Sequence, residues 1–165
     1  MRRRVVAAAA VALVAGAGCS GGSGTGSGGD GHLVVQRVAK VATALMDEPG
    51  RADYCSADSL LVITAMGHNR AAGFAARTRL PLNPTRTFVV QRALGAVGTA
   101  TAAFRLASGS GRLAASGTLR LQLSGTISGD FDVVVGDSAG TTVRFKGKLM
   151  HIRVRTLPPA ACQDV

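Results

Sequence analysis

The 165-residue sequence has no tryptophan, a single tyrosine and only nine acidic residues. Only five Phe and one Tyr accompany 19 basic residues. This shortage of aromatic side chains argues against a nucleic-acid partner, because bases are held by aromatic stacking beside the cations. Charged residues make up only 17% of the chain and hydrophobic residues 47%, a balance that excludes an intrinsically disordered protein. The length suits one ordinary domain. The composition therefore predicts one folded domain without a nucleic-acid partner.

Long hydrophobic runs are also lacking. The longest one near the N-terminus, Val5 to Ala15, has eleven residues, whereas about 20 are needed to cross a bilayer. Arg2, Arg3 and Arg4 precede this run, and the small residues Gly16-Ala17-Gly18 follow it. A basic, an apolar and a small-residue region in this order predict a signal peptide over residues 1–18.

At Cys19 this segment resembles a bacterial lipoprotein signal, in which small residues lead into a cysteine that is acylated and becomes the first residue of the mature chain. The resemblance is confined to about the first 20 residues, and Gly16 stands where the family usually has an aliphatic residue. It implies lipidation of Cys19 and an exported protein anchored to the outer face of the cell membrane. Cleavage after Ala17, which would give a secreted protein, remains the alternative. Sixteen Arg against three Lys, with abundant Ala, Gly and Val, is typical of GC-rich bacteria and indicates an actinobacterium.

The residues after Cys19 predict a flexible tether. Ser20 to Gly31 contains seven glycines and three serines, and such a composition behaves as a random coil spanning roughly 20 Å. We therefore expect a lipidated cysteine and tether over residues 19–31, and a single domain over residues 32–165.

Within this domain the sequence predicts one helix, from His32 to Glu48. Asp30 would cap it, Val34, Val38, Val41 and Leu45 would form its apolar stripe, and Pro49-Gly50 would end it. After Cys55 the hydrophobic pattern changes to a period of two, which is typical of antiparallel strands. The expected strands are Leu60 to Met66, Gly73 to Leu80, Thr87 to Arg92, Val97 to Ala107, Arg112 to Ser124, Thr126 to Val135 and Thr141 to Thr156. The predicted fold class is α+β, with the helix packed on a curved antiparallel meander or half-barrel of about six to seven strands.

The last three strands can be aligned from their side chains. A turn at Ser124-Gly125-Thr126 places Leu119 opposite Phe131, and Arg120 opposite Asp130. A turn over residues 136–140 places Asp132 opposite Arg144, Asp130 opposite Lys146, and Gly129 opposite Gly147, so the sheet is expected to bend at these glycines. The apolar positions of the last strand change from odd to even numbers, which predicts a β-bulge near Met150 or His151.

Three cysteines leave one unpaired in an oxidising compartment. If Cys19 is lipidated, Cys55 and Cys162 remain as a pair, and we expect a disulfide between them. The histidines lie far apart in the sequence, so no metal site and no cofactor are predicted. Asp130 and Asp132 could form a carboxylate pair on one strand face, but the cations expected opposite them favour a structural role, and no catalytic residue is predicted.

Arg70, Arg77 and Arg79 are the candidate contacts with an anionic surface. Anionic lipid headgroups and cell-wall polymers fit an exported protein better than other polyanions do, and solvated arginines without a partner are the alternative. The expected inward residues Ala100, Ala102, Ala115 and Gly117 are small, which allows either close packing of the helix or a cavity. The resulting hypothesis is a membrane-anchored, non-enzymatic binding or structural module of the cell envelope. A carrier of a lipid or other apolar ligand, held between helix and curved sheet, is the alternative, and the oligomeric state is left open.

Overall fold

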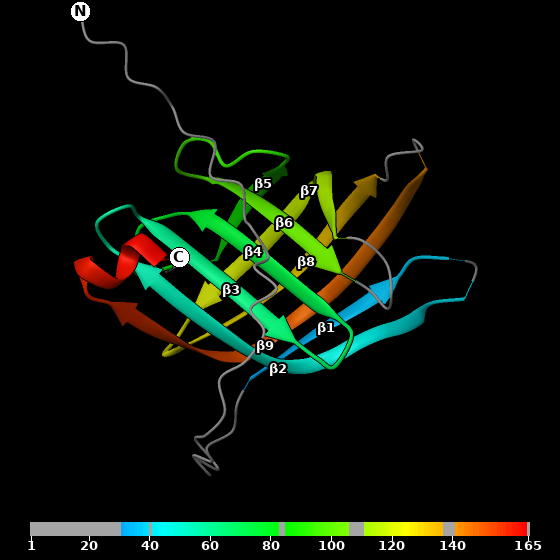
Figure 1. Cartoon of the computed structure of the whole chain (residues 1–165), viewed down its shortest axis with the longest axis horizontal. Helices are drawn as coiled ribbons and strands as arrows, with labels where there is room; N and C mark the ends of the chain where they lie inside the picture. The colour runs from blue at the N-terminus through cyan, green and yellow to red at the C-terminus, as the bar shows by residue number, and fades with distance from the viewer. Residues whose placement is uncertain (1–30, 40, 83–84, 106–110, 137–140, 165) are drawn as a thin grey trace, which may run out of the picture.

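The computed structural model describes residues 31–39, 41–82, 85–105, 111–136 and 141–164. Within these residues, nine strands close into a barrel (Figure 1). In chain order they are β1 (His32–Arg37), β2 (Thr43–Cys55), β3 (Leu60–Met66), β4 (Ala71–Arg77), β5 (Arg86–Gln91), β6 (Thr99–Arg105), β7 (Arg112–Leu123), β8 (Thr126–Gly136) and β9 (Thr142–Leu157), followed by the short 3-10 helix η1 (Pro159–Asp164). Around the barrel the order is β1-β2-β3-β4-β6-β5-β7-β8-β9, and β9 pairs with β1 to close it.

The predicted helix over residues 32–48 is wrong, and with it the α+β class. This segment forms β1 and the first half of β2, and Pro49-Gly50 lies within β2 instead of ending an element. The reason is a period of two: Leu33 and Val35 alternate into the core and are fully buried. Val38 and Val41, which the helical stripe required inside, are 40% and 77% exposed. The half-barrel is corrected in the same way, because β1 fills the gap between β2 and β9 and closes the sheet.

The strand predictions after Cys55 are confirmed. β3 has the predicted bounds, and the other six strands begin and end within three residues of the predicted positions. Alternation of apolar and polar residues with frequent glycine is therefore sufficient to locate these strands.

The predicted alignment of the last strands is confirmed on one side only. Leu119 faces Phe131 and Arg120 faces Asp130, as expected. Between β8 and β9 the prediction is wrong by two residues: Asp130 faces Lys148, and Asp132 faces Lys146. Because the error is an even number, every side chain stays on the predicted face of the sheet. The charged row across three strands is Arg120, Asp130 and Lys148 in place of the predicted Lys146.

The predicted bulge in β9 is confirmed. Ile152 faces Ile127, but Leu149 faces Gly129, so β9 has one more residue than β8 in this interval. The extra residue lies at Met150-His151, where His151 has a positive φ of 53°. As a result both Leu149 and Ile152 point into the core.

Four phenylalanines meet in the barrel interior. The ring of Phe74 lies 5.7 Å from that of Phe104 and 4.8 Å from that of Phe131, and Phe104 lies 5.2 Å from Phe145, measured between centroids. These rings come from β4, β6, β8 and β9. The small inward residues Ala100 and Ala102 are therefore complemented by aromatic rings and not by a helix.

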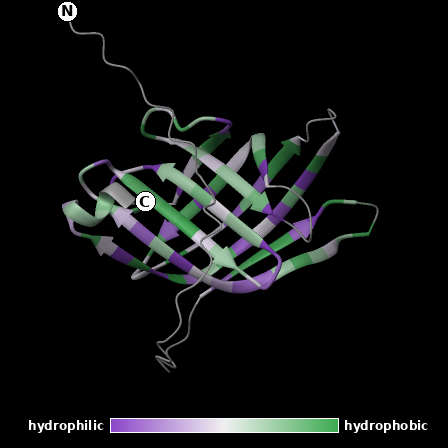
Figure 2. Ribbon diagram, in the orientation of Figure 1, coloured by the Kyte–Doolittle hydropathy of each residue, from purple (hydrophilic) through white to green (hydrophobic). Residues whose placement is uncertain are grey.

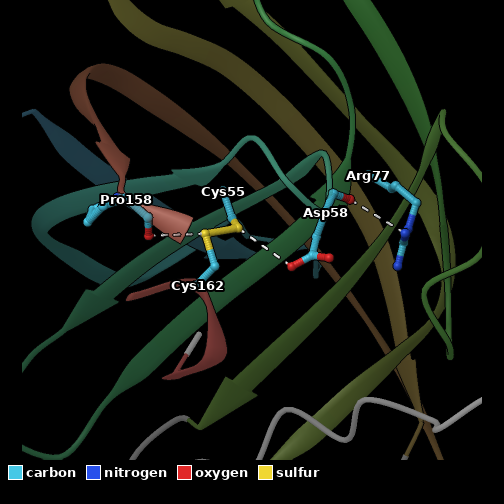
Figure 3. Close-up of a disulfide and its surroundings, with 5 residues drawn as sticks. All are labelled: Cys55, Asp58, Arg77, Pro158 and Cys162. Carbon is cyan, nitrogen blue, oxygen red and sulfur yellow. Dashed lines mark hydrogen bonds between the residues drawn. A yellow bond between two sulfur atoms is a disulfide. The ribbon is translucent and has the colours of Figure 1, made fainter. Parts of the chain in front are cut away.

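The predicted disulfide is present. The Sγ atoms of Cys55 and Cys162 are bonded at 2.00 Å, and their Cα atoms lie 5.6 Å apart. This disulfide joins the end of β2 to η1 (Figure 3). Here β2 and β9 also pair in parallel, with Cys55 beside Leu157. The carboxylate of Asp58 lies 3.5 Å from the Cys55 sulfur. The C-terminal end of the described chain is thus fixed to the barrel by a covalent bond and by strand pairing.

Candidate functional site: the outer surface of the barrel

The three candidate arginines do not form one patch. Arg70 lies in the β3–β4 turn and donates to the carbonyl of Leu45. Arg77 ends β4 seven residues later, and its Nη1 lies 3.5 Å from the carbonyl oxygen of Asp58. Arg79 is exposed just beyond β4. At about 3.3 Å per residue, Arg70 and Arg77 are separated by roughly 23 Å along the strand. Cys19, the candidate lipidation site, lies outside the described residues.

Two aspartates, Asp53 on β2 and Asp132 on β8, are each held by two cations. Asp132 accepts two hydrogen bonds from Arg144 at 2.6 Å, and Lys146 lies 3.2 Å away. Arg144 therefore reaches Asp132 diagonally, although it does not face Asp132 in the strand register. On β2, Asp53 binds Arg155 of β9 through one carboxylate oxygen and Arg51 through the other, both at 2.8 Å. These carboxylates serve to join neighbouring strands.

The hydrogen bonds from Arg144 lower the pKa of Asp132 below its ordinary value of 3.8, and Lys146 acts in the same direction. A lowered pKa in the folded state means that this contribution to stability is complete above about pH 4 and is lost as the pH falls through the folded-state pKa. The contact of Asp132 with its two cations is therefore weakened only at a pH below the ordinary pKa of an aspartate.

We expect Asp132→Asn to flatten the acid limb of the stability curve. Denaturant midpoints of wild type and variant should differ by a small amount at neutral pH and converge between about pH 4 and pH 2. The reason is that only the wild type has a carboxylate at position 132 to protonate. The difference should shrink in high salt, since the ion pairs are partly exposed. Parallel curves over the whole range would mean that the ion pairs contribute nothing.

Acidic residues are absent from a long part of the sequence. Between Ser59 and Gly129 there is no Asp, Glu or Lys, but there are eight arginines, so this stretch has a net charge of +8. It contains strands β3 to β7. The arginines are Arg70, Arg77, Arg79, Arg86, Arg92, Arg105, Arg112 and Arg120. One half of the barrel is therefore purely basic, whereas the other half balances its cations with acids.

The centre of this half is uncharged. On β4, the side chains of Ala72, Phe74 and Ala76 belong to the core, so the alternate residues point outward. Strand pairing arranges the outward residues in rows across β3, β4, β6 and their neighbours. The rows are Met66-Ala71-Arg105, then Thr64-Gly73-Ala103-Leu113, then Val62-Ala75-Thr101, and finally Leu60-Arg77 beside Thr99-Val89. We call these rows the neutral outer face; its only charges are Arg105 at one end and Arg77 at the other.

The neutral outer face is nearly inaccessible to solvent in its centre and exposes apolar side chains at its margin. Its outward alanines and Thr101 retain only 3% to 8% of their surface exposed. The larger residues Met66, Val89 and Leu113 are exposed by 64%, 60% and 51%. In Figure 2 the strands β3, β4 and β6 are coloured white to green over most of their length, whereas β2 and β9 carry purple segments. The apolar surface that this half offers is thus concentrated at its margin.

A serine motif in the β8–β9 connection has no catalytic context. Gly136-Asp137-Ser138-Ala139-Gly140 matches the spacing Gly-x-Ser-x-Gly, which sequence reasoning overlooked. In hydrolases that spacing joins a strand to a helix and exposes the serine at the turn. Here the flanking elements are the antiparallel strands β8 and β9, and residues 137–140 lie outside the described ones.

The described residues contain no three His, Cys, Asp or Glu side chains close enough to hold a metal ion. Nor does this part of the chain include a helix long and apolar enough to span a bilayer. What the described arrangement supports chemically is surface contact, through apolar side chains and arginines. A search of protein-family models, curated proteins and solved structures finds no match to the chain.

Sequence reasoning missed the neutral outer face. The stretch without acids was visible in the sequence by simple counting, but the outward alignment of its small residues was not. That alignment requires β4 to pair with β6, with β5 placed on the far side of β6.

Proposed function

We propose that this protein is a lipid-anchored protein of the cell envelope whose barrel acts as a non-enzymatic binding or structural module. The observation that carries the proposal is the pairing of cysteines: Cys55 and Cys162 are bonded to each other, which leaves Cys19 as the third cysteine of the sequence. Cys19 directly follows the small residues of the signal segment and directly precedes the Gly/Ser tether. A disulfide also suits a protein that leaves the reducing cytoplasm.

Several features of the barrel support binding in preference to catalysis. Its described interior is lined by apolar side chains that contact one another. The hydrogen bonds from Arg144 hold the pKa of Asp132 below 3.8, so this carboxylate is not poised to exchange a proton near neutral pH. The surface of the barrel is then the part that can recognise another molecule, and the neutral outer face is the surface that differs from the rest.

The alternative of a carrier loses its basis. It required a cavity between an N-terminal helix and a curved sheet, and residues 32–37 are instead a strand of the barrel wall. Inside the barrel, the rings of Phe74, Phe104, Phe131 and Phe145 pack against one another.

Metabolic labelling with a fatty-acid analogue tests the anchor. We expect label on the wild-type protein and none on Cys19→Ser, because the acyl chains are attached to that residue. Cys162→Ser is the matched control: it also removes one cysteine, and it should remain labelled. Equal labelling of wild type and Cys19→Ser, or no label on either, would refute the proposal.

A further inference from the structure

The neutral outer face combines exposed apolar side chains with arginines. Its margin presents Met66, Val89 and Leu113 to solvent, and its two ends carry Arg105 and Arg77, with the exposed Arg79 just beyond. The end rows are six residues apart along β6, or roughly 20 Å. Three of its strands, β3, β4 and β6, lie side by side at the front of Figure 1. An apolar surface with cations at its ends, and with no acid in its strands, fits an anionic and partly apolar surface.

We propose that the neutral outer face rests on the anionic surface of the lipid bilayer to which the chain is anchored. This inference rests on the proposed function, since the anchor supplies the bilayer. The arginines contact the lipid headgroups, while the marginal apolar side chains enter the region between headgroups and acyl chains. The barrel then lies on its side with the paired charges of β8 and β9 turned away from the membrane. The ion pair of Arg51 with Asp53 on β2 lies at the border of the face, because Asp53 is the register partner of Val62.

A second copy of the chain is a poorer partner for this face. Two copies docked through it would bring together two surfaces that have arginines and no acids in their strands. Like charges at an interface oppose association, and they would have to be desolvated without a counter-charge. An anionic bilayer supplies that counter-charge.

A dissolved polyanion such as a wall polymer is also a poorer partner. It would neutralise the arginines, but it offers nothing to Met66, Val89 and Leu113, which would stay in water. A bilayer interface accommodates both kinds of side chain.

The tether strengthens a contact that is weak by itself. Cys19 is separated from the first described residue by 12 positions, and a coil of that length spans roughly 20 Å. A link that behaves as the sequence predicts gives the barrel an effective concentration at the membrane in the millimolar range. A surface affinity that would be negligible for a free protein is then enough to orient the anchored one.

The test measures vesicle binding without the anchor. The chain from residue 19 onward with Cys19→Ser contains the whole closed barrel, which lies within residues 31–164. We expect this protein to sediment with vesicles that contain phosphatidylglycerol, to bind pure phosphatidylcholine much more weakly, and to be released by high salt. Because the anchor is absent, failure here leaves the labelling of Cys19 unaffected, and the two proposals fail separately.

Charge-reversal pairs locate the contact. Arg105→Glu alters one end of the neutral outer face, and Arg79→Glu alters the exposed arginine just beyond the other end. Lys148→Glu with Arg153→Glu changes the charge of β9 on the other half by the same amount. Each cation near an anionic membrane contributes about fivefold in affinity, so the first pair should weaken binding by about 25-fold or more. The second pair should weaken it by less than about threefold. Equal losses for both pairs would overturn the proposed orientation.

An apolar variant separates a bilayer from a dissolved polyanion. Val89→Ser with Leu113→Ser keeps every charge and removes exposed apolar area, and we expect about a fivefold loss of vesicle affinity. Unchanged binding would mean that the arginines act alone, which contradicts insertion into a bilayer. A stable dimer in sedimentation equilibrium that dissociates in this variant would assign the face to a second copy. Unaltered circular dichroism and thermal unfolding establish that each variant is folded.

Discussion

Replacing Gly147 by alanine is expected to destabilise the barrel by about 3 kcal/mol, because the site has no room for a methyl group. Gly147 lies in β9 between Val35 of β1 and Phe131 of β8. A Cβ at this position would overlap the backbone carbonyl of Val34 and the ring of Phe131. The ring is held in the aromatic cluster and the carbonyl belongs to β1, so neither can move without disturbing the closure of the barrel. Urea midpoints of wild type and variant measure the loss.

Gly136→Ala is the matched control for this experiment. Gly136 ends β8, and a Cβ there would meet no atom within 4 Å. The same substitution should leave stability unchanged or raise it by up to about 1 kcal/mol, because alanine restricts the unfolded chain. Similar losses at the two positions would show that crowding at Gly147 is not the cause.

Removing the disulfide is expected to cost about 3 to 4.7 kcal/mol, a large share of the roughly 5 to 15 kcal/mol that stabilises a typical domain. The bond joins residues separated by 107 positions, and the loop-entropy contribution increases with the length of the closed loop. The measurement compares the wild type with the double variant Cys55→Ala and Cys162→Ala in urea. Cys19→Ser, which also lacks a cysteine, should unfold at the wild-type midpoint. A loss below about 1 kcal/mol in the double variant would mean that the pairing of β2 with β9 already fixes the C-terminal end.

The strands after Cys55 could be located from sequence because each has one face in the core and one face in water. Leu61, Ile63 and Ala65 of β3, for example, alternate with more exposed residues. The segment 32–48 was misread because valines at helical spacing coincide there with a second pattern. Leu33 and Val35 are two residues apart, and the intervening Val34 is only half-buried. In a segment rich in aliphatic residues, both periods find matches, and only the partners β2 and β9 decide between them.

Register was recoverable where the turn is short. The two-residue connection Ser124-Gly125 fixes the register of β7 against β8, and the predicted pairing of these strands is confirmed. Between β8 and β9 the connection is longer, and a shift of two residues keeps both the apolar faces and the opposition of charges. The sequence alone could not distinguish Lys146 from Lys148 as the partner of Asp130, because either pairing places a cation opposite the carboxylate.

Only part of the candidate site could be predicted from the sequence. Arg77 and Arg79 were identified by their type, and the structure places them at one end of the neutral outer face. The face itself depends on a non-sequential neighbour, because β4 pairs with β6 and not with β5. A sequence read as consecutive hairpins places β5 between them and conceals the continuous rows of small residues.

The closing strand pair joins the two ends of the barrel sequence, and this determines the order in which the chain can fold. Val35 of β1 pairs with Gly147 of β9, so β1 can form only its hairpin with β2 until almost the entire domain is available to fold. During that interval the sheet is open and has unpaired edges, the condition in which neighbouring chains exchange strands or aggregate. If the chain is exported and anchored as proposed, it is dispersed in two dimensions during this vulnerable period. The density of new chains on the membrane, and not only their sequence, should then govern how many barrels close correctly.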